Sequence, residues 1–364
     1  MNAQSISAAL LIGCCALSSM AASQQNTRKT ALAKTASTPG SASGPAYALR
    51  EDVMLAAADI AERRDLEVDW VRKVLAQAHY LASVAKLIQP PPTGVPKNWQ
   101  LYRSRFIEPV RIKAGVKFWQ DNRRALARAE SETGVPTEII VGIVGVETIY
   151  GRQMGKIRVL DALATLAFDF PLKHPRAAQR SAFFKDELEQ FLSLAWRTGL
   201  DPLTALGSYA GAMGMPQFMP SSWARYAVDF DGDGKIDLQR SAADTIGSVA
   251  NYLKVFNWQV GLPTHYGVRF DADKLELEAL LTNDVLPTLS VTQLIAKGAL
   301  LDAQALTQPG LMALIELQNG DAPPSYFVGT ENFYVITRYN WSAYYAMAVI
   351  ELGQEVARAM KPID

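Results

Sequence analysis

The sequence contains very little cysteine, and all of it lies near one end. Cys14 and Cys15 are the only two cysteines in 364 residues. The chain beyond them can therefore form no disulfide of its own and has no thiol for catalysis. Its stability must come from a packed apolar core, to which a bound metal ion would add.

The sequence also lacks an excess of charge of either sign. Its 36 Lys and Arg residues balance its 36 Asp and Glu residues. Proteins that bind nucleic acid usually carry a basic excess, and acidic disordered chains carry the opposite imbalance. Neither class fits this composition, so we expect no nucleic-acid partner and a ligand that is neutral or recognised locally.

Several common catalytic motifs are missing. The three histidines, at positions 79, 174 and 265, do not have the spacing of a zinc site. The sequence has no G-x-S-x-G elbow, no phosphate-binding loop and no dinucleotide fingerprint. Zinc-dependent, serine-dependent and nucleotide-dependent chemistry are therefore poor explanations for this chain.

Long hydrophobic runs are absent except at the N-terminus, where "AALLIGCCALSSMAAS" follows a short polar start. This run is too short for a permanent membrane span and predicts a signal peptide over residues 1–21. Within it, "LIGC" has the residue order of a bacterial lipoprotein cleavage site, which makes Cys14 a candidate for lipidation. Ordinary signal cleavage near Ala21 or Ala22 is the alternative. Residues 22–45, rich in Ser, Ala and Thr, predict a flexible linker.

From residue 46 onward the spacing of apolar residues predicts a mainly helical (α+β) chain with a minor β component. We expect helices at 51–64, 69–88, 116–132, 136–150, 180–199, 242–258 and 342–360. We expect strands within 264–273 and 325–339.

One glutamate stands near the end of a very apolar segment. Residues 137–150 read "TEIIVGIVGVETIY", and a helix there is apolar around almost its whole circumference, which predicts burial. We expect this helix to stop at Gly151. A buried carboxylate needs a partner or a function. Glu147 could pair with Arg152 or Arg158, or it could be a general acid whose pKa is raised by desolvation and by the helix dipole.

An aspartate-rich loop has the spacing of a metal site. "DFDGDGKID", residues 229–237, matches the start of an EF-hand calcium loop, with Gly234 at its sharp turn. The spacing predicts side-chain ligands from Asp229, Asp231 and Asp233, a backbone carbonyl from Lys235, and a direct or water-bridged contact from Asp237. Arg240 occupies the twelfth position, so either Asp244 closes the site or the ion is held weakly. A solvated turn without a metal is the alternative.

A segment of small residues and a C-terminal aromatic tract are further candidates. "GSYAGAMGMPQFMPSSW", residues 207–223, lets backbone approach a ligand closely, and Ser208 and Gln217 could hydrogen-bond a sugar. Core packing explains its Met and Phe residues equally well. "TRYNWSAYY" adds Tyr339, Asn340 and Tyr345, although Asn340 could simply cap the last helix.

Together these segments, with "DTIGSVANYL" between them, resemble the membrane-bound lytic transglycosylase B family. The resemblance implies a lysozyme-like helical core over 134–260, containing the EF-hand-like loop 229–244. It also implies a helical accessory region over 46–133, a small β region over 261–332, and a C-terminal segment, 333–364, that returns to the core. Glu147 matches the catalytic glutamate. The substrate-lining positions match Ser208, Gln217, Tyr252, Tyr339, Asn340 and Tyr345, and Arg180 matches an arginine near the peptide branch of the substrate.

The implied activity is cleavage of peptidoglycan between N-acetylmuramic acid and N-acetylglucosamine without water, which forms 1,6-anhydromuramyl ends. The resemblance also implies a structural Ca²⁺, with Na⁺ as the alternative ion, and no organic cofactor. It further implies a lipid anchor in the outer membrane, facing the periplasm, and other cell-wall enzymes as partners. Two alternatives remain at this point. One is a hydrolytic muramidase that uses Asp161 or Asp169 as a second carboxylate, and the other is a non-catalytic protein that binds glycan strands.

Overall fold

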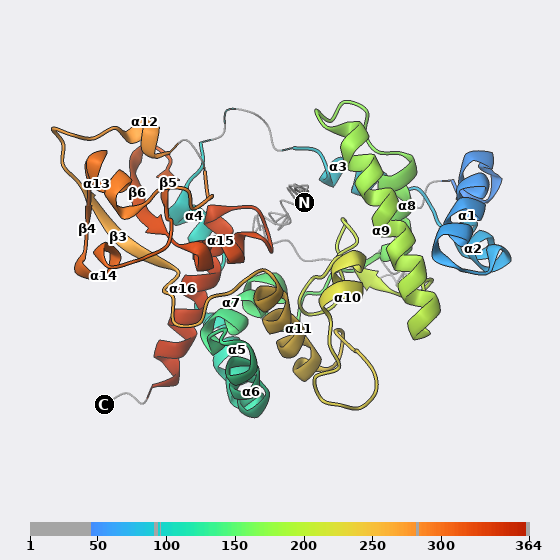
Figure 1. Ribbon diagram of the computed structural model, residues 1–364. Helices are drawn as coiled ribbons and strands as arrows, with labels where there is room; N and C mark the ends of the chain where they lie inside the picture. Colours follow the sequence, from blue (N-terminus) through green and yellow to red (C-terminus); the bar gives the residue numbers. More distant parts are fainter. Residues whose placement is uncertain (1–44, 91–93, 95, 282–283, 362–364) are drawn as a thin grey trace, which may run out of the picture.

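The computed structural model describes residues 45–90, 94, 96–281 and 284–361. The predicted signal peptide, Cys14 and nearly all of the predicted linker lie outside the described residues. Figure 1 shows an elongated molecule, with a small sheet at one end, a group of helices in the middle and the first two helices at the other end. None of the described helices is both long and apolar enough to cross a membrane.

The described residues form sixteen α-helices, which confirms the predicted mainly helical class. The helices are η1 (Tyr47–Leu49), α1 (Glu51–Arg64), α2 (Val68–Leu75), α3 (Ala82–Leu87), α4 (Trp99–Arg103), α5 (Pro109–Asp121), α6 (Arg123–Thr133), α7 (Thr137–Thr148), α8 (Val159–Phe168), α9 (Ala177–Thr198), α10 (Pro220–Tyr226), α11 (Ala242–Val255), α12 (Leu277–Leu280), α13 (Val291–Ala296), α14 (Ala303–Leu306), α15 (Glu331–Thr337) and α16 (Ala343–Met360). The strands are β1 (Ile157–Arg158), β2 (Leu206–Gly207), β3 (His265–Phe270), β4 (Ala299–Leu301), β5 (Ala313–Asn319) and β6 (Ala322–Gly329).

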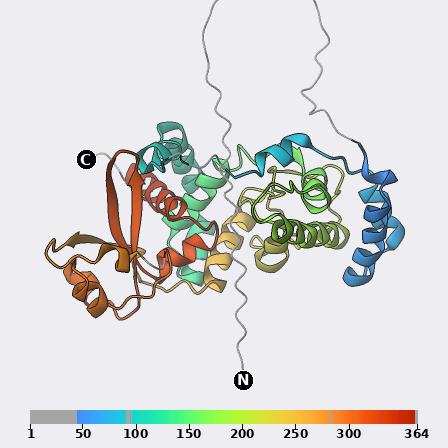
Figure 2. The ribbon, with the colours of Figure 1, turned by 90° about the horizontal axis from the view of Figure 1, so that it is seen from above.

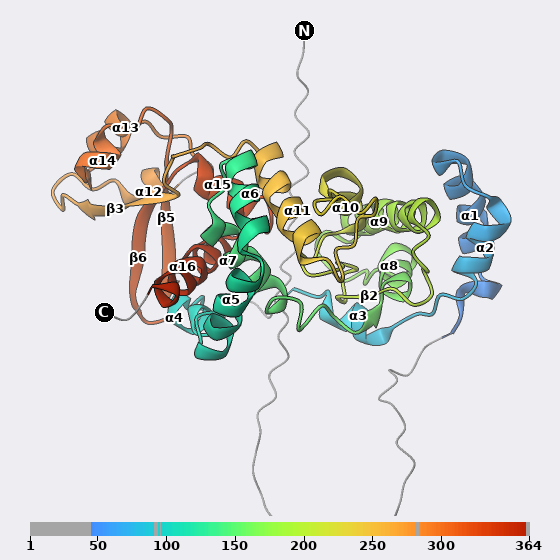
Figure 3. The same cartoon turned by 90° about the horizontal axis from the view of Figure 1, so that it is seen from below.

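The central helix α7 packs against α16, which comes from the far end of the sequence. Two glycines allow this close approach. A Cβ atom at Gly142 would lie 2.2 Å from the Val349 carbonyl oxygen, and one at Gly353 would lie 2.1 Å from the Glu138 carbonyl oxygen. Figures 1 and 3 both draw α16 beside α7. The last 18-residue helix is thereby brought against the helix that carries Glu147.

The second half of the molecule is built on α8 and α9, which pack against each other. Figure 2 shows them on the opposite side of the molecule from the sheet, with α1 and α2 beyond them. Tyr47 and Arg50 tie the N-terminal end of this half to the end of α8. The Tyr47 hydroxyl donates to Asp169 Oδ2 at 2.6 Å, and Arg50 Nη1 pairs with Asp169 Oδ1 at 2.7 Å.

The four-stranded sheet is antiparallel throughout, with the strand order β4-β3-β6-β5. It has an apolar cluster of its own, separate from the main helical core, which includes Leu280, Leu294, Met312, Leu314 and Val328. The other face of the sheet joins the main core, because Ile315, Leu317 and Phe327 of β5 and β6 are buried among the helices.

Several predicted elements are wrong in extent or type. The helix expected over 69–88 is divided into α2 and α3, and the helix expected over 116–132 breaks at Asn122 between α5 and α6. The strand expected over 325–339 ends at Gly329, because Thr330 begins α15 by accepting a hydrogen bond from the backbone N–H of Asn332 at 3.2 Å. Helix α8 and strand β5 were not expected. Both are largely buried and their sequences lack clear periodicity.

Candidate active site

Glu147 is the next-to-last residue of α7, and the chain turns sharply after it. The helix ends at Thr148, earlier than the predicted Gly151, because Ile149 and Tyr150 adopt positive φ angles of 52° and 56°. Thr148 fixes this end. Its hydroxyl donates to the Met215 carbonyl at 2.8 Å and accepts from the Gly151 N–H at 2.9 Å. The turn is thus joined to the small-residue segment, and the half-buried Glu147 lies at the junction.

The Glu147 carboxyl is held in an environment that favours its protonated form. Burial raises its pKa from 4.5 to about 7, because an ionised carboxylate there loses hydration. The Tyr345 hydroxyl donates a hydrogen bond of 2.6 Å to Glu147 Oε1, which lowers the pKa and partly offsets the effect of burial. A carboxyl of this kind can give up a proton near neutral pH and is stabilised once it has done so.

The ion-pair explanation for Glu147 is wrong. Arg158 pairs with Asp161, with Nη2 and Oδ1 2.6 Å apart. Arg152 lies in the same cleft as Glu147, yet within the described part of the chain it makes no ion pair within 4.0 Å. Glu147 therefore has no cationic partner among the described residues.

Glu147 separates two adjoining pockets. The smaller, of about 60 Å³, is lined by Glu147, Ala212, Gln217, Phe218, Met219, Ser222, Tyr252, Tyr339 and Asn340. The larger, of about 610 Å³, includes Glu147 and Gln217 again, together with Ser208, Tyr209 and the turn that follows α7. Because two residues are shared, the pockets form the two sides of one cleft, with Glu147 at the point where they meet.

The small-residue segment forms one wall of this cleft. Gln217 has a φ angle of 50°, and its side-chain amide donates to the carbonyls of Gly214 and Met154 at 2.9 and 3.2 Å. The Ser208 hydroxyl accepts from the backbone N–H of Ala212 at 3.1 Å and faces the larger pocket. These hydrogen bonds hold two polar side chains at fixed positions in the lining.

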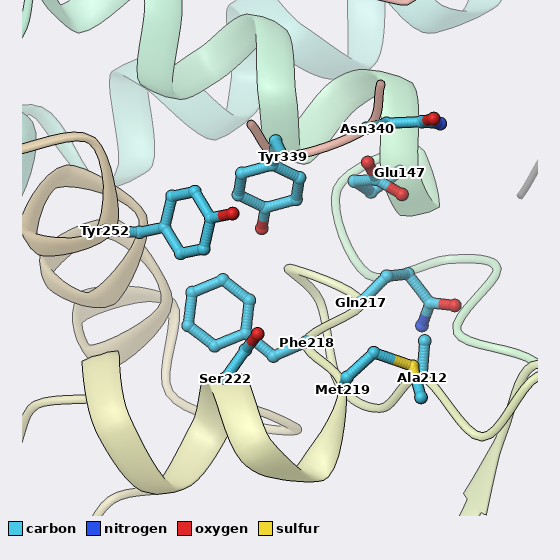
Figure 4. A pocket seen from close by; sticks show the side chains of 9 residues that line it. All are labelled: Glu147, Ala212, Gln217, Phe218, Met219, Ser222, Tyr252, Tyr339 and Asn340. Carbon is cyan, nitrogen blue, oxygen red and sulfur yellow. The ribbon is translucent and has the colours of Figure 1, made fainter. Parts of the chain in front are cut away.

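The aromatic part of the lining comes from α11, from Phe218 in the small-residue segment and from the chain between α15 and α16. Figure 4 shows Tyr252, Tyr339 and Phe218 gathered on one side of the pocket, with Glu147 and Gln217 on the other and Asn340 next to Glu147. The Tyr252 hydroxyl donates to the Arg338 carbonyl at 2.7 Å, and the Tyr339 hydroxyl donates to the Pro216 carbonyl at 2.5 Å. The rings are fixed by these bonds, and aromatic faces of this kind pack well against sugar rings.

The structure brings six of the seven predicted catalytic and saccharide-contacting residues to the lining of the cleft, namely Glu147, Ser208, Gln217, Tyr252, Tyr339 and Asn340. Tyr345 is buried behind the lining and reaches the site through Glu147. Arg180 is not among the residues that line either pocket. It is buried on α9, with its guanidinium 5.3 Å from the centre of the Phe184 ring.

The lining also contains residues that the sequence did not single out. Met219 and Ser222 stand just before and within α10, and Tyr209 follows Ser208. Their place in the "GSYAGAMGMPQFMPSSW" segment was the only available signal, because their chemistry is not distinctive.

The aspartate loop brings three carboxylates together. Asp229, Asp231 and Asp244 each place an oxygen within 4.8 Å of the others. Asp244 is buried at the start of α11 and also accepts from the backbone N–H groups of Phe230 and Asp237, both at 2.8 Å. Asp233 and Asp237 do not belong to this group. Their Oδ1 atoms accept from the backbone N–H groups of Lys235 and Gln239 at 2.8 and 2.9 Å.

The donor set of this loop fits a hard cation. Carboxylates accept hydrogen bonds and donate none, and three like charges this close repel unless a cation lies between them. Within the described residues none of Asp229, Asp231 and Asp244 forms an ion pair with Lys or Arg. The arrangement therefore suits Ca²⁺ better than a solvated turn, and Asp244 stands where the missing twelfth ligand of the loop would be needed.

The helical core and a cleft with one acidic side chain define a lysozyme-like enzyme class. Residues 50–354 match the family model described as the transglycosylase SLT domain, which spans most of the chain, so the protein belongs to this family.

Known relatives agree with this assignment. The chain is 44% identical over 305 residues to membrane-bound lytic murein transglycosylase B of Escherichia coli (strain K12), covering 79% of this chain and 78% of that protein. The crystal structure of the soluble lytic transglycosylase SltB1 from Pseudomonas aeruginosa is 43% identical, with a TM-score of 0.76, and the match covers 85% of this chain and 99% of that one. The E. coli lytic transglycosylase Slt35, solved in complex with calcium, is 41% identical, with a TM-score of 0.76 and coverage of 87% and 96%.

Proposed function

We propose that this lytic transglycosylase cleaves the β-1,4 bond between N-acetylmuramic acid and N-acetylglucosamine in peptidoglycan, with Glu147 as its one acid and base. The observation that carries this proposal is the state of Glu147. It is the single carboxyl in the lining of either pocket, and burial raises its pKa to about 7.

In the first step Glu147 donates its proton to the oxygen that links the two sugars. The C1–O bond of muramic acid breaks, N-acetylglucosamine leaves with a free hydroxyl, and positive charge develops at C1 and the ring oxygen. The substrate acetamido group and the polar lining stabilise this charge. Glu147 is now a carboxylate, and the hydrogen bond from Tyr345 stabilises it at this stage.

In the second step the C6 hydroxyl of the same muramic acid attacks C1. Its proton passes to Glu147, which returns to the protonated form, and the new C6–O–C1 bond closes the 1,6-anhydro ring. Atoms and charge balance without water. One carboxyl is sufficient because it acts first as an acid and then as a base.

The hydrolytic alternative requires a second carboxylate near the scissile bond. Its two candidates are engaged elsewhere. Asp161 pairs with Arg158 and accepts from the His79 N–H at 2.8 Å, and Asp169 pairs with Arg50. Neither lines the cleft. This supports the transglycosylase mechanism over hydrolysis.

We also propose that the aspartate loop binds a structural Ca²⁺ through Asp229, Asp231 and Asp244. The convergence of these three carboxylates supports the site, as does the calcium complex of Slt35. The ion would neutralise the loop and hold it against α11, and none of the three carboxylates lines either pocket. Na⁺ would fill the same site more weakly because it carries half the charge.

Cell-envelope association agrees with the name of the E. coli relative, which is membrane-bound. We propose a lipid anchor on Cys14 that places the enzyme on the periplasmic face of the outer membrane, close to glycan strands and to other cell-wall enzymes. Mass spectrometry of the N-terminus of the protein purified from cells tests this. A diacylglyceryl group on Cys14 supports the anchor, and a free N-terminus near residue 22 contradicts it.

The reaction itself is tested by digesting peptidoglycan in H₂¹⁸O and analysing the fragments by mass spectrometry. The proposal predicts anhydro ends without ¹⁸O for the wild type and no fragments for Glu147→Gln. Glu138→Gln, a matched change at the other end of α7, should leave the products unchanged. Reducing ends that carry ¹⁸O would support hydrolysis instead. Glycan binding with no turnover by the wild type would support a non-catalytic role.

A further inference from the structure

The two sides of the cleft differ in charge. The smaller pocket contains no cationic side chain, and none of the nine residues drawn in Figure 4 is Lys or Arg. The larger pocket contains three, namely Arg111, Arg152 and Lys156. Its only acidic lining residue is Glu147, which stands at the boundary and has a raised pKa. The larger side of the cleft is therefore positive and the smaller side is uncharged.

Two of the three cations on the positive side are not neutralised by ion pairs among the described residues. Arg152 and Lys156 are exposed, and within the described residues neither makes an ion pair. Arg111 is buried on α5, where its guanidinium lies 5.1 Å from the centre of the Phe106 ring and donates to the Arg105 carbonyl at 2.7 Å. Two of these three cations are thus available to a ligand.

The turn that carries Arg152 and Lys156 is held in place at several points. The Gln153 N–H donates to the Thr148 carbonyl at 2.9 Å, and Ile157 pairs with Gly207 across β1 and β2. Between them, Gly155 has a φ angle of 94°, and a Cβ there would lie 2.0 Å from the Gly207 carbonyl oxygen. The turn is packed against the small-residue segment, so its two cations are presented from a fixed backbone.

The charged groups of peptidoglycan lie on its peptide branches. Its N-acetylated sugars are neutral along the strand, and the carboxylates belong to the branch carried by muramic acid. We propose that Arg152 and Lys156, with Arg111 adding to the positive field, bind the carboxylates of this peptide branch. The inference rests on the proposed function and deepens it, because it makes the anionic branch a determinant of substrate choice. The resemblance had given a role near the branch to Arg180, which does not line the cleft.

Arg152 and Lys156 are exposed, and this limits how much each can add to the affinity for the peptide branch. A single exposed ion pair changes a binding equilibrium by about fivefold or less. At physiological ionic strength, salt screens charges that lie more than about 8 Å apart. Two cations acting together should change affinity for an anionic branch by about tenfold, mostly in KM. They should act little on kcat, because neither is needed to move a proton at Glu147.

The test compares glycan strands that carry stems with free carboxylates and the same strands after the carboxylates have been converted to amides. For each enzyme we take the ratio of kcat/KM on the strands with free carboxylates to kcat/KM on the amidated strands. In the double variant Arg152→Gln with Lys156→Gln this ratio should be about tenfold lower than in the wild type. Added NaCl should lower the ratio for the wild type but not for the variant. Arg123→Gln with Arg124→Gln, which removes two exposed cations at the α5–α6 turn, should keep the wild-type ratio.

The outcomes are distinct from those of the catalytic proposal. An unchanged ratio in a variant that melts at the wild-type temperature would overturn the inference, and so would an equal loss on both substrates. A second double variant, Arg152→Glu with Lys156→Glu, reverses both charges and should lower the ratio further. Cleavage by Glu147→Gln would instead overturn the proposed function and would leave the ratio test interpretable.

Discussion

The cleft and the aspartate loop place carboxyl groups in opposite surroundings. In the cleft one carboxyl, Glu147, stands among apolar and aromatic side chains, and burial raises its pKa to about 7. In the loop Asp229 and Asp231 are exposed and converge with the buried Asp244, and their oxygens accept backbone N–H groups. Isolation and desolvation produce a proton donor, whereas convergence and hydrogen bonding produce a site for a cation.

The surroundings of an acidic residue decide its chemistry. Tyr345 offers Glu147 a single hydrogen bond, enough to stabilise the carboxylate without keeping it ionised. Asp229, in contrast, is exposed and accepts from the N–H groups of Gly232 and Gly234 at 2.7 and 2.8 Å.

The largest expected effect comes from replacing one carboxyl with an amide in each region. Glu147→Gln removes the proton donor and should reduce cleavage by about 10³-fold while the response to calcium remains. Asp229→Asn should abolish the response to calcium while most of the activity remains. Turbidity loss of a peptidoglycan suspension and thermal unfolding with and without Ca²⁺ measure both. Loss of both properties in either variant would show that the two regions are not independent.

Calcium itself should stabilise the fold. At a free concentration one hundred times its Kd, the ion adds about 2.7 kcal/mol, which raises the melting temperature by about 5 °C. A chelator should reverse the rise. Asp273→Asn, at an exposed aspartate of the β region, is the control and should respond to Ca²⁺ as the wild type does. An equal rise in Asp229→Asn would contradict the assigned ligands.

Glu147 should also destabilise the fold in a pH-dependent way. Its folded pKa is raised above the unfolded value of 4.5, so the folded state loses stability as the pH rises from about 4.5 to about 7. Glu147→Gln should therefore be more stable than the wild type by about 3 kcal/mol at pH 8, and no more stable at pH 4. Denaturant unfolding at the two pH values measures this, and a pH-independent difference would contradict the raised pKa.

The smallest effect is expected at Tyr345. Tyr345→Phe removes the hydrogen bond that favours the carboxylate, so the pKa of Glu147 should rise by roughly half a unit to one unit. The alkaline limb of the kcat/KM profile should move upward by the same amount. Tyr344→Phe changes the neighbouring residue, whose hydroxyl bonds to Gln318, and should leave the profile in place. A downward shift in Tyr345→Phe would be inconsistent with this role.

The sequence predicted the features that depend on local pattern. A lone acid in an apolar helix indicated Glu147, and the spacing of the EF-hand loop indicated Asp229 and Asp231. Features that depend on distant packing could not be read in this way. Tyr345 reaches Glu147 from 198 residues away, a contact that the close approach of α7 and α16 allows. Its place in the site came only from the family resemblance.

Other errors have equally specific causes. The sequence left Arg158 as a possible ion-pair partner of Glu147. It could not show that Arg158 pairs instead with Asp161, three residues further along the chain in α8. Asp233 and Asp237, which accept hydrogen bonds from nearby backbone N–H groups, stand outside the group of three carboxylates, and their role as ligands stays a prediction. The aromatic and β-branched run after Thr330 suggested a strand, whereas the cap at Thr330 starts a helix.

Titration of the Glu147 carboxyl shows whether it is a desolvated acid that is protonated near neutral pH. Glutamate carboxyl carbons labelled with ¹³C can be followed by NMR from pH 4 to pH 9 in the wild type and in Glu147→Gln. Glu187, buried on α9, also has a pKa raised to about 7 by burial, so Glu187→Gln is needed to separate the two signals. We expect one resonance with a pKa of about 7 that disappears in Glu147→Gln and remains in Glu187→Gln. A Glu147 resonance that titrates near 4.5 would contradict it.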